Sequence, residues 1–112
     1  MATAATTVDV PPHVTPDRVV DFDFYNDPRF AADDIHTAFA KMLKQVPPVF
    51  WTPHNGGHWV IAGHEELFEA SRNTELFSSA KGGLPPSPYE PSQLPISIDP
   101  PRHAIYREPL AR

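Results

Sequence analysis

The sequence predicts an α+β fold, and three observations support this class. Apolar side chains recur at helical spacing over residues 31–46. Two runs of β-branched and aromatic residues, 49–52 and 58–62, flank an Asn-Gly-Gly turn. A proline-rich stretch then precedes what reads as the first turn of a helix at Asp99. We therefore expect a helix, a β-hairpin, a short helix, a long proline-rich loop and the start of another helix, in that order.

Residues 1–20 predict an extended arm, because they are small and polar and contain three prolines. Residues 21–25, DFDFY, alternate polar and apolar side chains, and the turn sequence Asn26-Asp27-Pro28 follows them. This segment is expected to form either a short strand or an extended stretch laid against the body of the protein.

The helix expected over residues 31–46 has one apolar stripe. Asp33 and Asp34 fall in its first turn, where acidic side chains favour the positive end of the helix dipole. Proline cannot continue the helical hydrogen bonds, so Pro47 and Pro48 end the helix. The stripe consists of Ile35, Ala38, Phe39, Met42, Leu43 and Val46.

A second, shorter helix is expected over residues 64–72, after Gly63 ends the hairpin. Leu67, Phe68 and Ser71 are predicted to face inward on this helix. The aromatic side chains of the hairpin and of the segments behind it are interpreted as core rather than as a ligand cage. These aromatic residues are Phe50, Trp51, Trp59, Phe68 and Phe77.

Residues 80–98 hold five prolines and two glycines without periodicity, which predicts a long irregular loop. A helix is expected to begin after it, with Asp99 as N-cap and Pro100 in the first turn. Pro109 is expected to kink that helix just beyond Arg107. Because a lone two-stranded hairpin is marginally stable, we expect residues 1–112 to be a single incomplete domain, the front of a larger protein.

The composition excludes several classes of function. The net charge of −5 argues against nucleic acid as a partner. No apolar run is long enough to cross a membrane, and the first residues lack the basic and apolar regions of a secretion signal. The chain has no cysteine, so it offers neither disulfides nor thiolate chemistry. A cytoplasmic protein is expected.

The histidines raise the question of a metal site. His54 and His58 have the spacing of a helical zinc pair, but they straddle the expected turn and therefore do not share a helix face. A third ligand would have to come from elsewhere. We therefore interpret these residues as a pair of histidines that flank a turn, and we expect no metal site among them.

A second constellation lies near Arg107. His103 and Arg107 are four residues apart, so a helix would place them on one face about one turn apart. A histidine beside an arginine fork suits a carboxylate ligand. The alternative is a solvated helix face.

The motif Asp99-Pro100-Pro101-x-His103-x-x-x-Arg107 resembles the start of the C helix in the cytochrome P-450 haem-thiolate monooxygenases. The resemblance continues upstream, in the order found in the bacterial camphor-monooxygenase group. The matching stretches are residues 11–14 (PPHV), 22–24 (FDF), 25–26 (YN), 51–52 (WT), 55–59 (NGGHW) and 77–79 (FSS). The fold it implies is the N-terminal portion of the mainly helical cytochrome P-450 fold.

The resemblance implies that His103 and Arg107 hydrogen-bond a propionate of haem b. It implies insertion of one atom of O₂ into an apolar, terpenoid-like substrate, with electrons from NAD(P)H through a reductase and an iron–sulfur ferredoxin. The cysteine that holds the iron would lie outside these residues, which should be inactive alone. Arg102 and Arg112 are hypothetical docking charges for the ferredoxin, with solvated arginines as the alternative.

The loop before this helix carries substrate contacts in the family. We expect an apolar pocket wall from Leu84, Tyr89, Ile96 and Ile98. Pro91 falls where the camphor hydroxylase has a tyrosine donor, which puts camphor itself in doubt as the substrate. A hypothesis of a different class is a small α/β protein-binding module whose proline-rich segment docks a partner, without catalysis.

Overall fold

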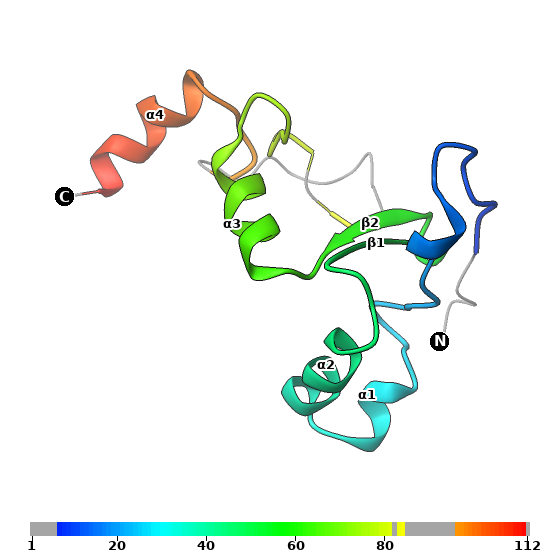
Figure 1. Cartoon of the computed structure of the whole chain (residues 1–112). Coiled ribbons are helices and arrows are strands. Elements are labelled where there is room, and N and C mark those ends of the chain that lie inside the picture. Colours follow the sequence, from blue (N-terminus) through cyan, green and yellow to red (C-terminus); the bar gives the residue numbers. More distant parts are fainter. Residues whose placement is uncertain (1–6, 82, 85–95, 112) are drawn as a thin grey trace. The chain divides into compact units, whose positions relative to one another are not determined.

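The computed structural model describes residues 7–81, 83–84 and 96–111. The chain divides into two units, Met1–Leu67 and Phe68–Arg112, and each is described by itself. The predicted α+β class is confirmed, since short helices accompany one antiparallel sheet (Figure 1). The elements in order are η1 (Pro16–Arg18), α1 (Arg29–Ala32), α2 (Ile35–Leu43), β1 (Val49–Thr52), β2 (His58–Ile61), α3 (His64–Arg72), α4 (Arg102–Arg107) and η2 (Glu108–Leu110).

The β-hairpin forms as the sequence predicts. β1 and β2 pair antiparallel, with Val49 opposite Ile61 and Thr52 opposite His58. The turn between them needs left-handed backbone at three successive residues, Asn55 (φ 56°), Gly56 (φ 87°) and Gly57 (φ 76°). Asparagine and glycine adopt this conformation at least cost, so the turn sequence fixes the register of the hairpin.

The single helix predicted over residues 31–46 is wrong in two respects, because the structure breaks it into α1 and α2 and because α2 ends at Leu43, three residues before the predicted end. Asp34 has extended backbone (ψ 152°), and its side chain accepts from the backbone N–H of His36 and Thr37. Asp34 is therefore the N-cap of α2 rather than part of a first helical turn. Aspartate competes for backbone hydrogen bonds in this way more readily than it continues a helix.

Residues 19–22 lie along the free edge of β1. Val19 bridges Trp51 in parallel, and the N–H of Val20 donates to the carbonyl of Trp51 over 2.9 Å. The hydroxyl of Thr52 donates to the carbonyl of Phe22 over 2.6 Å. Of the two sequence-based alternatives for the DFDFY segment, the extended stretch laid against the body therefore describes residues 21–23, whereas Phe24 and Tyr25 already belong to a turn.

The core of the first unit forms where this segment, α2 and the hairpin meet. Phe22, Met42 and Phe50 are each at most 2% exposed. The ring of Phe22 makes an edge-on contact with that of Phe50, with centroids 5.9 Å apart. Partly buried apolar residues surround the three: Val20, Phe30, Phe39, Val46, Val60 and Ala62.

The second unit is organised differently. α3 begins in the first unit and reaches Arg72, as the sequence predicts. The prediction that three of its residues face inward is wrong, because Leu67 and Phe68 are 54% and 56% exposed and Ser71 is exposed too. The interpretation of the aromatic set as core is wrong for Trp59, Phe68 and Phe77, which are 45–56% exposed, and correct for Phe50 and Trp51. Trp59 alternates with Val60 along β2, and Val60 is the one that packs against the core. Phe68 on α3 and Phe77 in the turn after it belong to the second unit, in which no described side chain is buried to form a core around them.

The described part of the chain has no helix that is both long and apolar enough to cross a membrane.

Candidate functional site

The expected carboxylate site lies on α4. His103 and Arg107 both belong to this helix, four residues apart, so their side chains leave the same face about one turn apart. His103 is half-buried and Arg107 is exposed. Among the described residues, neither side chain has a hydrogen bond or ion pair with another part of the chain.

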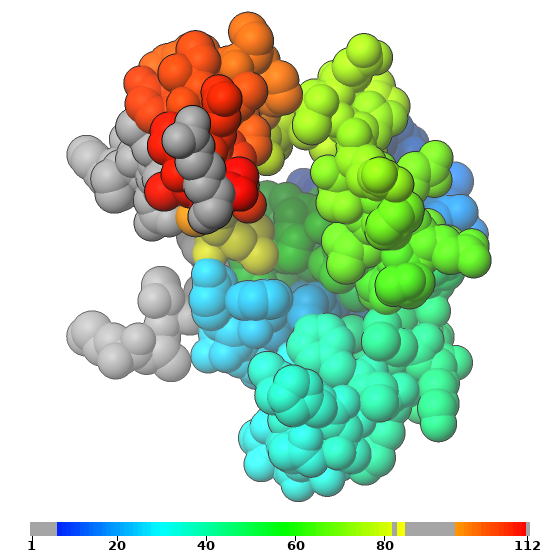
Figure 2. Space-filling view, turned by 90° about the vertical axis from the view of Figure 1, so that its left-hand side faces the viewer, coloured from blue at the N-terminus to red at the C-terminus, as the bar shows by residue number. Residues whose placement is uncertain are grey.

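Arg107 stands at the end of α4, where the backbone changes from α-helical to 3₁₀ geometry in η2. Pro109 lies in the first turn of η2 and explains the change, since it has no N–H to continue the α-helical bonds. At the position of the expected kink, the α-helix thus ends at Arg107 and a 3₁₀ turn follows. Figure 2 shows the side chains of α4 and η2, in orange to red, at the surface of the protein.

The start of α4 differs from the prediction. Pro101, not Asp99, is the N-cap, and no side chain caps the helix. The carboxylate of Asp99 instead accepts from the hydroxyl of Ser78 and from the N–H of Ser79, the latter over 2.7 Å. The Ser78 hydroxyl, followed by the Ser79 N–H, lowers the pKa of Asp99 below 3.8. Asp99 therefore ties the chain before the loop to the chain after it.

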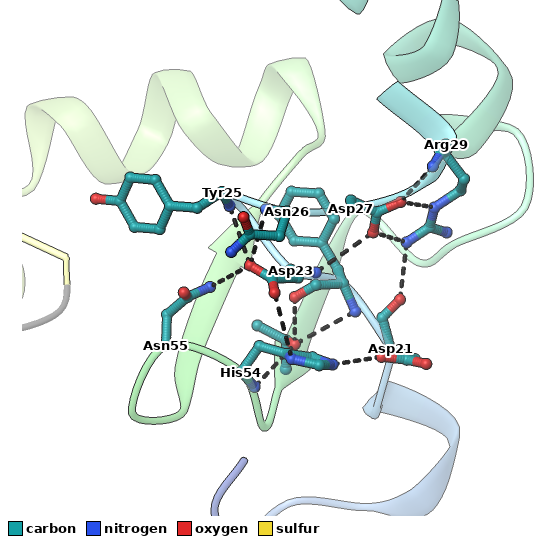
Figure 3. Close-up of polar contacts among 10 residues, drawn as sticks. Asp21, Asp23, Tyr25, Asn26, Asp27, Arg29, His54 and Asn55 are labelled. Carbon is teal, nitrogen blue, oxygen red and sulfur yellow. Dashed lines mark hydrogen bonds and ion pairs between the residues drawn. The ribbon is translucent and has the colours of Figure 1, made fainter. Parts of the chain in front are cut away.

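A polar cluster in the first unit escaped the sequence analysis. The guanidinium of Arg29 holds Asp27 with two hydrogen bonds, Nε to Oδ1 over 2.7 Å and Nη2 to Oδ2 over 2.6 Å (Figure 3). The Asp27 side chain is only 3% exposed, and the bonds from Arg29 are the main cause of its lowered pKa. The turn sequence Asn26-Asp27-Pro28 gave the only local signal for this cluster.

The other half of the cluster joins residues 21–26 to the hairpin turn. Asp23 accepts from the N–H groups of Tyr25 and Asn26 and from the amide of Asn55. Burial raises the pKa of Asp23, but these hydrogen bonds and the nearby His54 outweigh it, so the net shift is downward. His54 Nε2 lies 2.5 Å from Asp21 Oδ1. His54 therefore takes part in carboxylate contacts rather than pairing with His58.

The histidines do not converge. His58 lies on β2 and its Nδ1 is 3.2 Å from the carbonyl of Trp59. Over the described ranges, 7–81, 83–84 and 96–111, no three His, Asp or Glu side chains are placed to hold one metal ion.

Comparison with known proteins identifies the chain. It is 31% identical over 106 residues to a probable cytochrome P-450 127A1 of Sinorhizobium fredii, covering 88% of this chain and 26% of that protein. The crystal structure of CYP101J2 superposes with a TM-score of 0.78 and 34% identity, over 90% of this chain and 26% of that one. The chain belongs to the cytochrome P-450 family.

Two further relatives are named for the reactions they carry out. Linalool 8-monooxygenase of Pseudomonas putida is 34% identical over 88 residues, which is 65% of this chain and 21% of the relative. Steroid C26-monooxygenase of Mycobacterium tuberculosis is 31% identical over 74 residues, which is 58% of this chain and 17% of the relative. The chain thus spans about a quarter or less of the curated relatives it matches. No protein-family model matches it.

The predicted fold, an N-terminal portion of the cytochrome P-450 fold, is confirmed by the superposition on CYP101J2. The predicted pocket residues stay a prediction. Leu84 and Ile98 are half-buried and Ile96 is 69% exposed. Tyr89 and Pro91 lie outside the described residues, as does most of the loop.

The residues on α4 fit the haem of a cytochrome P-450. A haem propionate is a carboxylate, and arginine is always charged and presents a planar fork to such a group. Histidine one turn away adds a second donor. None of the 112 residues is a cysteine, so these residues do not supply a thiolate to the iron.

Proposed function

We propose that this chain is part of a haem-thiolate monooxygenase and that it supplies the propionate contacts of haem b through His103 and Arg107. The observation that carries the proposal is the match to cytochrome P-450 proteins over 90% of the chain, with both residues on one face of α4. A haem held by a cysteine thiolate supplies the oxygen-activating chemistry when bound. The 112 residues alone are expected to be inactive.

The proposed role of Arg107 is to pair with the propionate as a permanent cation. A charge-assisted bond from guanidinium to carboxylate is both shorter and stronger than a neutral one. His103 contributes a ring N–H to the same group, and its half-buried position on α4 limits the directions in which the ring can point. Together the two side chains would orient the propionate and anchor the haem edge.

The proposed substrate is an apolar, terpenoid-like small molecule. Two relatives carry the names of hydrocarbon-rich substrates, linalool and a steroid. Leu84, Ile96 and Ile98 offer apolar side chains, and Tyr89 offers one hydroxyl, which is the composition expected of a small-molecule pocket. Electrons would come from NAD(P)H through a reductase and an iron–sulfur ferredoxin.

The family activity is tested on the full-length protein. Its reduced, haem-replete form should show the shifted Soret band of a CO-bound thiolate haem. A haem-replete sample without that shift would reject the monooxygenase.

The propionate contacts are tested separately by haem retention. His103→Ala and Arg107→Ala should each speed transfer of haem to an acceptor protein by about tenfold, the loss expected for one charge-assisted hydrogen bond. His103→Gln keeps a donor and should retain haem better than His103→Ala. Arg102→Ala removes a neighbouring arginine of the same helix and should change nothing. Unchanged retention in both alanine variants would reject the assignment even if the CO spectrum is normal.

A further inference from the structure

The carboxylate of Asp99 joins two segments of the second unit that are 20 residues apart in the sequence. Its Oδ2 accepts from the hydroxyl of Ser78, and its Oδ1 accepts from the backbone N–H of Ser79 over 2.7 Å. Ser78 Oγ in turn accepts from the N–H of Ala80 over 3.1 Å, so this hydroxyl both donates and accepts. Both oxygens of Asp99 are thus engaged. We call the contacts of Asp99 with Ser78 and Ser79 the Asp99 clasp.

On one side the clasp is continuous with the end of α3. Asn73 directly follows this helix. Its side-chain oxygen accepts from the N–H of Leu76 over 3.2 Å, and its carbonyl accepts from the N–H of Phe77 over 3.0 Å. The turn that leads from α3 to Ser78 is therefore held by hydrogen bonds of its own, and Ser78 occupies a defined position at the end of that turn.

On the other side the clasp is continuous with α4. The backbone carbonyl of Asp99 accepts from the N–H of His103 over 3.1 Å. Asp99 is therefore bound through its side chain to the segment after α3 and through its main chain to the first turn of α4. α4 has no side-chain cap, and none of its residues is buried.

The direction of α4 decides where its side chains can reach. At about 1.5 Å per residue, the five steps from Arg102 to Arg107 span about 7.5 Å, so a tilt of about 15° at the start of α4 displaces Arg107 by about 2 Å. A charge-assisted hydrogen bond is only about 2.7–2.9 Å long, so such a displacement weakens or breaks it.

We propose that Asp99 is a positioning residue for the haem: through the Asp99 clasp it sets the direction of α4, and thereby the place at which His103 and Arg107 present their donors to a propionate. This inference rests on the proposed function of these two side chains. Both oxygens of Asp99 are engaged by Ser78 and Ser79, and a carboxylate repels a propionate. Asp99 therefore acts through α4 and not by contact with the haem.

The alternative is that the clasp joins the two segments while α4 keeps its direction without it. The two possibilities differ in how the effects of substitutions combine. Effects that are independent of one another multiply in a rate, whereas effects that act through one shared contact do not.

The test is the rate of haem transfer from the haem-loaded, full-length protein to an acceptor protein. Ser78→Ala removes a donor to Asp99 and should speed transfer by about two- to fivefold, as expected for one neutral hydrogen bond. Ser78→Thr keeps the hydroxyl and should restore retention. Ser79→Ala keeps the backbone N–H that donates to Asp99, so it should retain haem as the unaltered protein does. Asp99→Ala removes the acceptor of both bonds and should speed transfer at least as much as Ser78→Ala.

The deciding measurement repeats Ser78→Ala and Asp99→Ala in a protein that already carries His103→Ala and Arg107→Ala. In that protein neither substitution should speed haem transfer further, because the contacts that the clasp positions are gone. The Soret band of the reduced, CO-bound form should stay the same in every variant, which shows that the thiolate still holds the iron.

The inference alone is overturned if Arg107→Ala speeds haem transfer while Ser78→Ala and Asp99→Ala do not. It is also overturned if their effect is as large in the doubly altered protein as in the unaltered one, or if Ser79→Ala matches Ser78→Ala. If His103→Ala and Arg107→Ala both leave transfer unchanged, the proposed function and this inference are rejected together.

Discussion

The two units of the chain differ in where their large apolar side chains lie. In the first unit Phe22, Met42 and Phe50 are almost fully buried, although they come from three separate segments. In the described part of the second unit no side chain is buried, and Phe68, Leu76, Phe77 and Ile105 are 49–77% exposed. Both units use helices with an apolar side, so amphipathic patterning alone does not make a core. A core requires a second apolar layer at the right distance.

The second unit is held by local polar contacts instead. The N–H of Phe77 donates to the carbonyl of Asn73, and the carboxylate of Asp99 accepts from Ser78 and Ser79. A helix as short as α4, six residues, is marginal by itself. The difference between the units is thus one of burial, with stabilisation by a core in the first unit and by turns and local polar contacts in the described part of the second.

The largest effect expected is from removing a core side chain of the first unit. Phe22→Ala should cost about 3–5 kcal/mol of unfolding free energy, because it leaves a cavity among Phe30, Phe39 and Phe50. Such a loss is comparable with the whole stability of a small domain. Circular dichroism during urea unfolding of the 112-residue chain measures it. Phe77→Ala, the same substitution at a 49% exposed site, should cost less than about 1 kcal/mol. Equal losses of unfolding free energy in the two variants would contradict the conclusion that only the first unit has a core.

The next effect tests whether close packing in the first unit extends to the hairpin turn. A Cβ at Gly57 would lie 2.6 Å from Val8 Cγ2 and 2.7 Å from Trp51 Cζ2. Gly57→Ala should therefore cost about 2–4 kcal/mol, from steric overlap together with a left-handed backbone. Gly56→Ala has the same backbone demand but open space around the Cβ, and should cost only about 1 kcal/mol. If both variants unfold at the same urea concentration, the packing against Val8 contributes nothing.

A smaller effect should appear on acidification of the first unit. The pKa values of Asp23 and Asp27 are lowered below 3.8 in the folded protein, whereas they are ordinary in the unfolded chain. Their contribution to stability is therefore fully present above about pH 5, and it is lost as the pH falls below about 4 through the folded values. Thermal unfolding between these pH values measures the loss. Asp27→Asn should reduce the change of melting temperature with pH. Asp9→Asn, a substitution at an exposed site, should leave that change as it is in the unaltered protein.

The smallest effects come from two aspartates, one in each unit, whose side chains accept hydrogen bonds from nearby backbone N–H groups: Asp34, the N-cap of α2, and Asp99, which bonds Ser78 and Ser79. Asp34→Ala removes the acceptor for His36 and Thr37 and should speed amide exchange at the start of α2. Asp99→Ala should speed exchange at Ser79 and leave α2 unaffected. A change in α2 on Asp99→Ala would mean that the two units are energetically coupled.

The sequence predicted the elements whose causes are local. The Asn-Gly-Gly turn determined the hairpin and its register, because three adjacent residues satisfy its left-handed backbone. The helix of residues 64–72 and the change of geometry at Pro109 also follow from neighbouring residues. Placing His103 and Arg107 on one helix face needed only their spacing.

Tertiary structure decided which side chains are buried and which charged groups meet. His54 and Asp21 are 33 residues apart in sequence, and Thr52 and Phe22 are 30 apart, so no periodicity relates them. The sequence predicted that Asp34 and Asp99 each lie at the start of a helix. Asp34 does, as the N-cap of α2, but the carboxylate of Asp99 accepts hydrogen bonds from Ser78 and Ser79 instead. A local sequence pattern indicates which groups a residue can bind. Whether its side chain is buried, and which partner it meets, depends on the distant segment that the fold places next to that residue.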